Sequence, residues 1–176
     1  SSIALVLFLG LTATPHRAAA EDDAVDRGLA ESESLVRSGR YAEAESAARR
    51  ALERAEAIER QPGAATVRAL NALATILTVR ENAAEAEPLC RRALELRQKL
   101  NGTESVEYVV ALINLAYTLT ALHKASEAKT LYERALKIAA KLPPARPGSP
   151  AVAADAAALL RAQIENNLGE LLLAEG

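Results

Sequence analysis

Apolar positions recur along much of the chain with the spacing of one buried helix face. They fall at i, i+3, i+4 and i+7 in the segment Leu70, Leu73, Ala74 and Leu77. The same spacing returns further along the chain, at Leu112, Leu115, Ala116 and Leu119. Each segment therefore predicts an amphipathic helix, and we call helices of this type A.

A second pattern of alanines and charges occurs three times without a gap. Its copies span residues 41–53, 83–95 and 125–137, so each step is 42 residues. Every copy holds two alanines seven residues apart, which lie on one helix face and let a neighbouring helix approach closely. We predict a second helix, B, in each unit. A lone helix pair cannot bury both of its faces, so such units stack.

The predicted fold is all-α, an α-α superhelix or solenoid of about three and a half helix-pair repeats. A segment rich in Pro and Gly, residues 142–150, interrupts the register before the last helix. The predicted array covers residues 21–176, with repeats at about 25–66, 67–108 and 109–150 and a half repeat at 151–176.

The two ends of the array depart from this pattern. In the first unit, Gly28, Glu31 and Ser32 replace the apolar residues of the later A helices, which predicts a cap with a polar outer face. The last A helix has no following B helix in the sequence, which predicts an exposed apolar face. Self-association through this open C-terminal helix is one consequence that we consider.

Residues 1–20 are predicted to be a signal peptide that is incomplete at its N-terminus. The apolar run 3–11 is followed by the small residues 18–20 and then by acidic residues. The run is shorter than the roughly 20 residues that span a bilayer. We therefore expect export, to a bacterial periplasm or the extracellular space. The alternatives are an apolar tail and a membrane anchor whose start is missing.

Charge and composition exclude several function classes. The 21 basic and 23 acidic residues are interspersed, whereas nucleic-acid binders show a basic excess or stripe. A single Cys and two His residues cannot supply the four ligands of a usual zinc site. We weighed a Cys90–His123 dyad against a buried structural thiol and favour the thiol. No phosphate loop or serine elbow is present, so we expect no enzyme, cofactor or metal.

These motifs resemble the tetratricopeptide repeat. Its hallmark residues correspond here to Leu73-Ala74, Gly39-x-Tyr41, Ala44 and Ala51. The 42-residue unit resembles the kinesin-light-chain subtype, since the common unit has 34 residues. Two turn positions, Glu81 and His123, lack the Gly of Gly39. The resemblance spans roughly residues 24–176 and implies that the A helices line a concave binding groove.

The resemblance and the register together place a set of side chains in this groove. Asn side chains both donate and accept, so they suit the backbone of an extended peptide. The alternative is that these residues are merely solvated. The candidate peptide-binding residues are Arg68, Asn71, Asn114, Tyr117, Gln163 and Asn167. Further positions expected to face the groove are Leu29, Glu33, Thr75, Val110, Ile113, Asn166 and Glu170.

A non-enzymatic scaffold that binds a protein or an extended peptide is the function that the sequence favours. Of the expected groove residues only Arg68 is basic, with Glu33 and Glu170 opposing it, so a terminal carboxylate ligand is disfavoured. The alternative function is an accessory repeat region of a larger hydrolase or protease. Nucleic acid and a membrane span are not expected.

Overall fold

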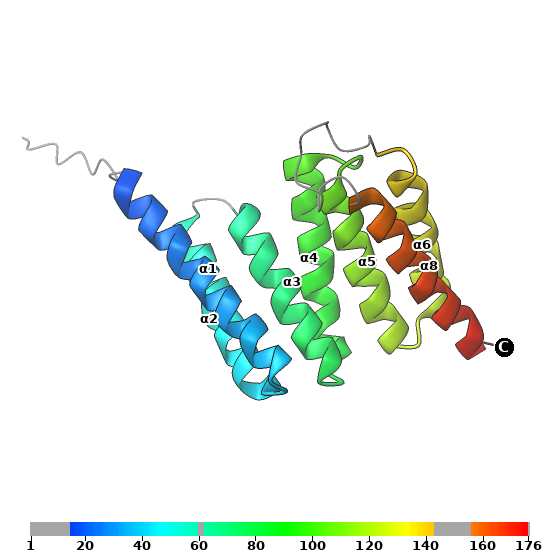
Figure 1. Ribbon diagram of the computed structural model, residues 1–176, viewed down its shortest axis with the longest axis horizontal. Coiled ribbons are helices and arrows are strands. Elements are labelled where there is room, and N and C mark those ends of the chain that lie inside the picture. The colour runs from blue at the N-terminus through cyan, green and yellow to red at the C-terminus, as the bar shows by residue number, and fades with distance from the viewer. Residues whose placement is uncertain (1–14, 60–61, 143–155, 176) are drawn as a thin grey trace, which may run out of the picture.

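The computed structural model describes residues 15–59, 62–142 and 156–175. Within these residues every regular element is a helix, which confirms the predicted all-α fold. Three helix pairs are followed by a single helix, in agreement with the expected three and a half repeats (Figure 1). The helices are α1 (Pro15–Arg37), α2 (Tyr41–Ile58), α3 (Ala64–Val79), α4 (Ala83–Asn101), α5 (Val106–Ala121), α6 (Ala125–Ala139) and α8 (Ala156–Glu175).

The helices keep the 42-residue step that the sequence shows. The B helices α2, α4 and α6 begin at residues 41, 83 and 125. The A helices α3 and α5 begin at 64 and 106 and end at 79 and 121, again 42 residues apart. Equal sequence spacing therefore produces equal structural units.

The A helices form the inner layer of the array. The backbones of α1 and α3, of α3 and α5, and of α5 and α8 approach each other directly. In the described part of the chain, the B helices α2, α4 and α6 make no such backbone contact with one another. The A helices therefore lie closer together than the B helices do, as expected for a stack that curves with its A side inward.

Small residues allow this close packing. The two alanines of each B helix are fully buried, and Leu73 and Leu115 of the A helices fill the space beside them. One continuous hydrophobic cluster runs from α2 to α8. The buried alanines of the three copies are Ala44, Ala51, Ala86, Ala93, Ala128 and Ala135.

The first unit differs from its prediction as a polar cap. Ser32 is 1% exposed and occupies the buried position of Ala74 in the next unit. Gly28 faces α2, since a Cβ added there would lie 3.3 Å from the Ala51 Cβ. Of these three residues, Glu31 alone is on the outer surface, where its carboxylate lies 3.8 Å from the Arg50 guanidinium. The prediction was wrong for Ser32, which is buried, and for Gly28, whose lack of a side chain permits close approach to α2.

The turn after each A helix has one conformation in all three units. Gly39, Glu81 and His123 have φ angles of 73°, 63° and 57°, in the left-handed region. The next amide N–H donates back to a carbonyl five residues earlier, as from Lys124 to Leu119 over 2.9 Å. This is the Schellman end of a helix, which usually employs Gly. Two units therefore form it without Gly.

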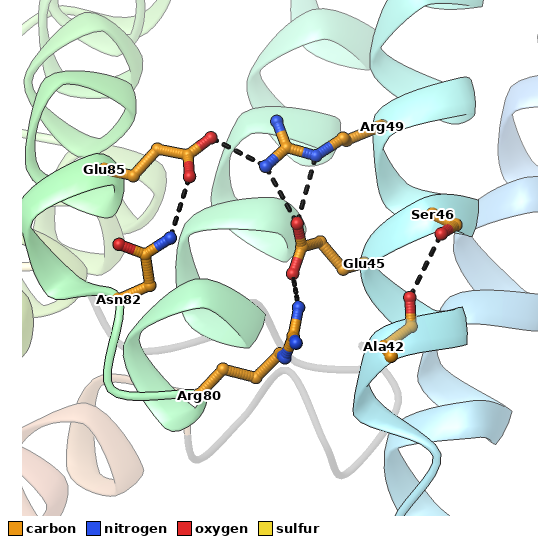
Figure 2. A network of polar contacts seen from close by, with 7 residues as sticks. All are labelled: Ala42, Glu45, Ser46, Arg49, Arg80, Asn82 and Glu85. Atoms are coloured by element: carbon orange, nitrogen blue, oxygen red, sulfur yellow. Dashed lines mark hydrogen bonds and ion pairs between the residues drawn. The ribbon is translucent and has the colours of Figure 1, made fainter.

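Ion pairs connect successive B helices (Figure 2). Arg49 of α2 bonds to Glu45 of its own helix at 2.8 Å and to Glu85 of α4 at 2.6 Å. Arg80, just after α3, also pairs with Glu45. The next unit repeats the arrangement one step on, with Arg91 bonded to Glu87 and Glu127 and Lys124 bonded to Glu87. Long side chains thus bridge the outer layer where the backbones diverge.

Both ends of the array bear on predictions made from the sequence. Residues 1–14 of the predicted signal peptide lie outside the described residues, and 15–20 belong to α1. None of the described helices is both long and apolar enough to cross a membrane. On α8, Leu159, Leu172 and Leu173 are exposed while Ile164 and Leu171 are buried. The last helix therefore has the exposed apolar side chains that the sequence predicts.

Candidate functional site

The inner layer contains a cavity of about 650 Å³ between α1, α3 and α5, with one residue from α4. We call it the A-helix cavity. Seven residues expected in the groove line it: Leu29, Glu33, Arg68, Asn71, Thr75, Val110 and Asn114. The remaining lining residues are Ser32, Val36, Arg37, Ala72, Ile76, Arg97, Val106 and Glu107. This volume falls within the range typical of ligand pockets, about 300–1,000 Å³.

The six candidate binding residues separate into two groups. Arg68, Asn71 and Asn114 line the A-helix cavity. Tyr117, Gln163 and Asn167 do not, and the last two lie on α8. The side chain of Tyr117 is 44% exposed on α5.

Two of the expected groove positions have other surroundings in the folded chain. Ile113 is buried in the hydrophobic core, so its expected place in the groove was wrong. Asn167 interacts with the phenol of Tyr132, whose pKa is raised by burial and lowered in part by Thr120 and Asn167. Asn167 therefore lies near α6 and is not among the residues that line the cavity, and its role in binding stays a prediction.

Two buried polar oxygens beside the cavity have no partner among the described residues. They are the Ser32 Oγ on α1 and the Asn71 Oδ1 on α3. A buried acceptor without a hydrogen bond costs about 1–3 kcal/mol. The apolar side chains of Leu29, Ile76 and Val110 surround these polar groups.

Charges at the cavity are of both signs. Arg68 pairs with Asp26 of α1, and Arg37 lies 3.9 Å from Glu33 on the same helix. Burial lowers the pKa of the Arg97 guanidinium, the Glu107 carboxylate opposes this shift, and Arg68 adds to it. The sequence-based expectation of Arg68 as the one basic groove residue was therefore too narrow, because Arg37 and Arg97 line the same cavity.

Cys90 and His123 are not brought together. Cys90 is 1% exposed, lies beside the Thr118 hydroxyl at 3.4 Å, and has its thiol pKa raised by burial. His123 is exposed in the turn after α5. Cys90 also occupies the buried position of Ala48 and Tyr132 in the other units, which confirms it as a packed thiol. Within the described residues, no group of three or more potential metal ligands is found.

Sequence comparison matches part of the chain to a known repeat family. Residues 65–141 match the tetratricopeptide repeat family, a segment that runs from α3 to the end of α6. No curated protein matches the chain significantly.

Two solved structures share the fold. BtubC (BKLC) from P. vanneervenii aligns with a TM-score of 0.64 and 21% identity, over 88% of this chain and 65% of that one. A TPR-like protein (ct2138) from Chlorobium tepidum TLS aligns with a TM-score of 0.62 and 16% identity, over 88% of this chain and 98% of that one. The chain thus spans just under two thirds of the BtubC structure. These likenesses support a helical-repeat fold like that of tetratricopeptide-repeat proteins. The family match over residues 65–141 supports a general role in protein interaction.

Proposed function

We propose that this tetratricopeptide-repeat array is a non-enzymatic scaffold that binds an extended peptide segment of a partner protein. The observation that supports this proposal is the A-helix cavity, which is lined on the inner helices by the carboxamide residues Asn71 and Asn114. A volume of about 650 Å³ accommodates a few side chains rather than a folded domain. An extended segment is the form of protein that presents both backbone and side chains to such a space.

The chemistry of the lining suits a peptide backbone. Asn71 and Asn114 carry carboxamides, which both accept from N–H and donate to C=O groups. Ile76, Val106 and Val110 offer apolar contacts to the side chains of the segment. Backbone hydrogen bonds of this kind supply affinity, and the apolar contacts supply selectivity.

The subtype and the cellular location belong to the same proposal. The 42-residue step of the helices favours a kinesin-light-chain-like repeat over the common 34-residue unit. The apolar run 3–11 and the small residues 18–20 favour export, to a periplasm or the extracellular space. The binding role applies equally to a stand-alone scaffold and to an accessory region of a larger hydrolase or protease.

A cavity-filling variant tests the binding site. Short peptides are selected from a displayed random library on the full chain, and their affinities are measured by fluorescence anisotropy. Ala72→Trp places a large side chain in the cavity and is expected to weaken binding at least about tenfold, which is roughly 1.4 kcal/mol. Ala57→Trp, on the exposed side of α2, is the matched control and should bind as the wild type does.

Two outcomes would contradict the proposal. One is unchanged binding by Ala72→Trp when circular dichroism shows that it is folded. The other is failure of the library to yield any binding peptide. If Ala57→Trp lost affinity equally, the loss in Ala72→Trp would not be specific to the cavity.

A further inference from the structure

Arg97 breaks the repeat at a position that is otherwise a buried alanine. The equivalent residues, 42 positions before and after, are Ala55 in α2 and Ala139 in α6. These alanines are 0% and 1% exposed and pack in the core. In α4 the same position carries a guanidinium that lines the A-helix cavity. Packing alone explains Ala55 and Ala139 but gives no reason for a charge at Arg97.

The Arg97 guanidinium has no ion-pair partner among the described residues. Its Nη1 donates to Asn101 Oδ1 over 3.3 Å, and this oxygen is a neutral acceptor. The Glu107 carboxylate acts on the guanidinium only at longer range than an ion pair. The side chain is only partly exposed to solvent. A desolvated cation gains more from a carboxylate than an exposed one does, because the local dielectric constant is lower.

The other arginines of the cavity differ from Arg97 in this respect. Arg68 bonds to Asp26, and Arg37 lies within ion-pair distance of Glu33. Among the described residues, Arg97 is thus the one guanidinium of the cavity without a carboxylate at ion-pair distance. Glu33 and Glu107 also line the cavity, so a doubly charged phosphate would be repelled more strongly than a singly charged carboxylate.

We propose that Arg97 binds the carboxylate of an internal Asp or Glu side chain in the peptide that occupies the A-helix cavity. The planar guanidinium can donate two parallel hydrogen bonds to that carboxylate. Val106 and Val110 then contact aliphatic side chains next to the acidic residue. This inference rests on the proposed peptide-binding function and adds the chemistry of the partner: an extended, acidic and aliphatic segment.

Parallel library selections test the inference. A displayed library of random short peptides with blocked C-termini is selected on the wild-type full chain and on Arg97→Ala. This variant restores the residue of the other two B helices, so it is expected to fold. The matched control is Lys99→Ala, which removes an exposed positive charge from the same helix outside the cavity.

The wild-type and Lys99→Ala pools should be enriched in Asp or Glu beside aliphatic residues. The Arg97→Ala pool should keep the aliphatic preference and lose the acidic one. A selected peptide and its twin, with Gln in place of Glu, are then compared by fluorescence anisotropy. We expect the acidic peptide to bind the wild type about tenfold more tightly, and this ratio to fall below about twofold in Arg97→Ala.

The measurements distinguish a wrong inference about Arg97 from a wrong proposed function. If peptides bind and Ala72→Trp blocks them, but the acidic preference is absent or persists in Arg97→Ala, the inference is overturned and the proposed function stands. If no peptide binds the wild type, both are overturned.

Discussion

At the scale of single residues, two of the turns hold a residue with a Cβ in an unfavourable backbone conformation. Glu81 and His123 adopt the left-handed conformation that Gly39 adopts freely. An L-residue with a Cβ incurs about 1–2 kcal/mol in this region. The turns still form because the hydrogen bonds of the helix end and the packing of the helix pair outweigh this cost.

His123→Gly should therefore stabilise the protein. The gain is expected to be about 0.5–1 kcal/mol, since relief of the left-handed strain exceeds the extra chain entropy of Gly in the unfolded state. Gly39→Ala provides the converse control, because a Cβ there meets no atom within 4 Å and changes only backbone strain. It should lower the free energy of unfolding by a similar amount. Urea denaturation measures both, and a less stable His123→Gly would contradict this account.

At the scale of elements, α3 depends on a carboxylate from the preceding segment. The cap residue Gly63 has no side chain to accept from the first N–H groups of α3. Glu59 accepts from the amides of Gly63, Ala65 and Thr66 over 2.6, 3.2 and 3.2 Å, and from the Thr66 hydroxyl. A negative charge at a helix N-terminus is favourable because the free N–H groups carry partial positive charge.

Replacing Glu59 should destabilise the fold in a pH-dependent way. Burial raises the pKa of Glu59, but hydrogen bonds from Thr66, Gly63 and Ala65 outweigh it and leave the pKa below its ordinary value. Its contribution is therefore fully present above the unfolded value of about 4.3 and is lost as the pH falls through the folded pKa. Glu59→Ala is expected to lower the unfolding free energy by about 1 kcal/mol at neutral pH.

Urea denaturation at several pH values checks this prediction. The difference between wild type and Glu59→Ala should shrink as the pH is lowered from neutrality to below the folded pKa. The control is Glu53→Ala, which changes an exposed residue on α2, the helix that ends just before Glu59. It should show a much smaller effect. A constant difference across the pH range would show that the carboxylate does not act as a cap.

At the scale of the whole molecule, the hydrophobic cluster makes the helix pairs depend on one another. It includes residues from α2 through α8, so no single unit contains a complete core. Leu112 of α5 lies within it and is fully buried. The outer ion pairs add little to this by themselves, since exposed pairs contribute about 0–1 kcal/mol each.

Leu112→Ala should therefore weaken the array as a whole. The expected loss is about 3 kcal/mol, the sum of lost burial and the cavity left behind. Circular dichroism and tyrosine fluorescence should report coincident unfolding transitions at a lower urea concentration. Leu173→Ala, at a side chain 85% exposed on α8, should change stability by less than about 0.5 kcal/mol. Separate transitions for the two probes would show that the units unfold independently.

Half of the candidate binding residues meet in one cavity, while their role in binding stays a prediction. Arg68, Asn71 and Asn114 followed from the helical register and from the resemblance, and they line the cavity. Arg97 was not among the candidates because the resemblance implies a groove lined by the A helices, while Arg97 belongs to a B helix. Its signal was present in the sequence: an Arg in register with two alanines of the same repeat.

The sequence by itself determined the helices, their 42-residue step and the order in which they stack. These follow from local periodicity and from repetition, since each unit meets the same neighbours. Only the tertiary structure decided that Ile113 packs in the core while Asn71, 42 residues before it, lines the cavity. The two residues share a register position but not a chemistry, since Asn71 carries a polar carboxamide and Ile113 an apolar side chain. The A-helix cavity and the unpaired charge of Arg97 arise from that packing.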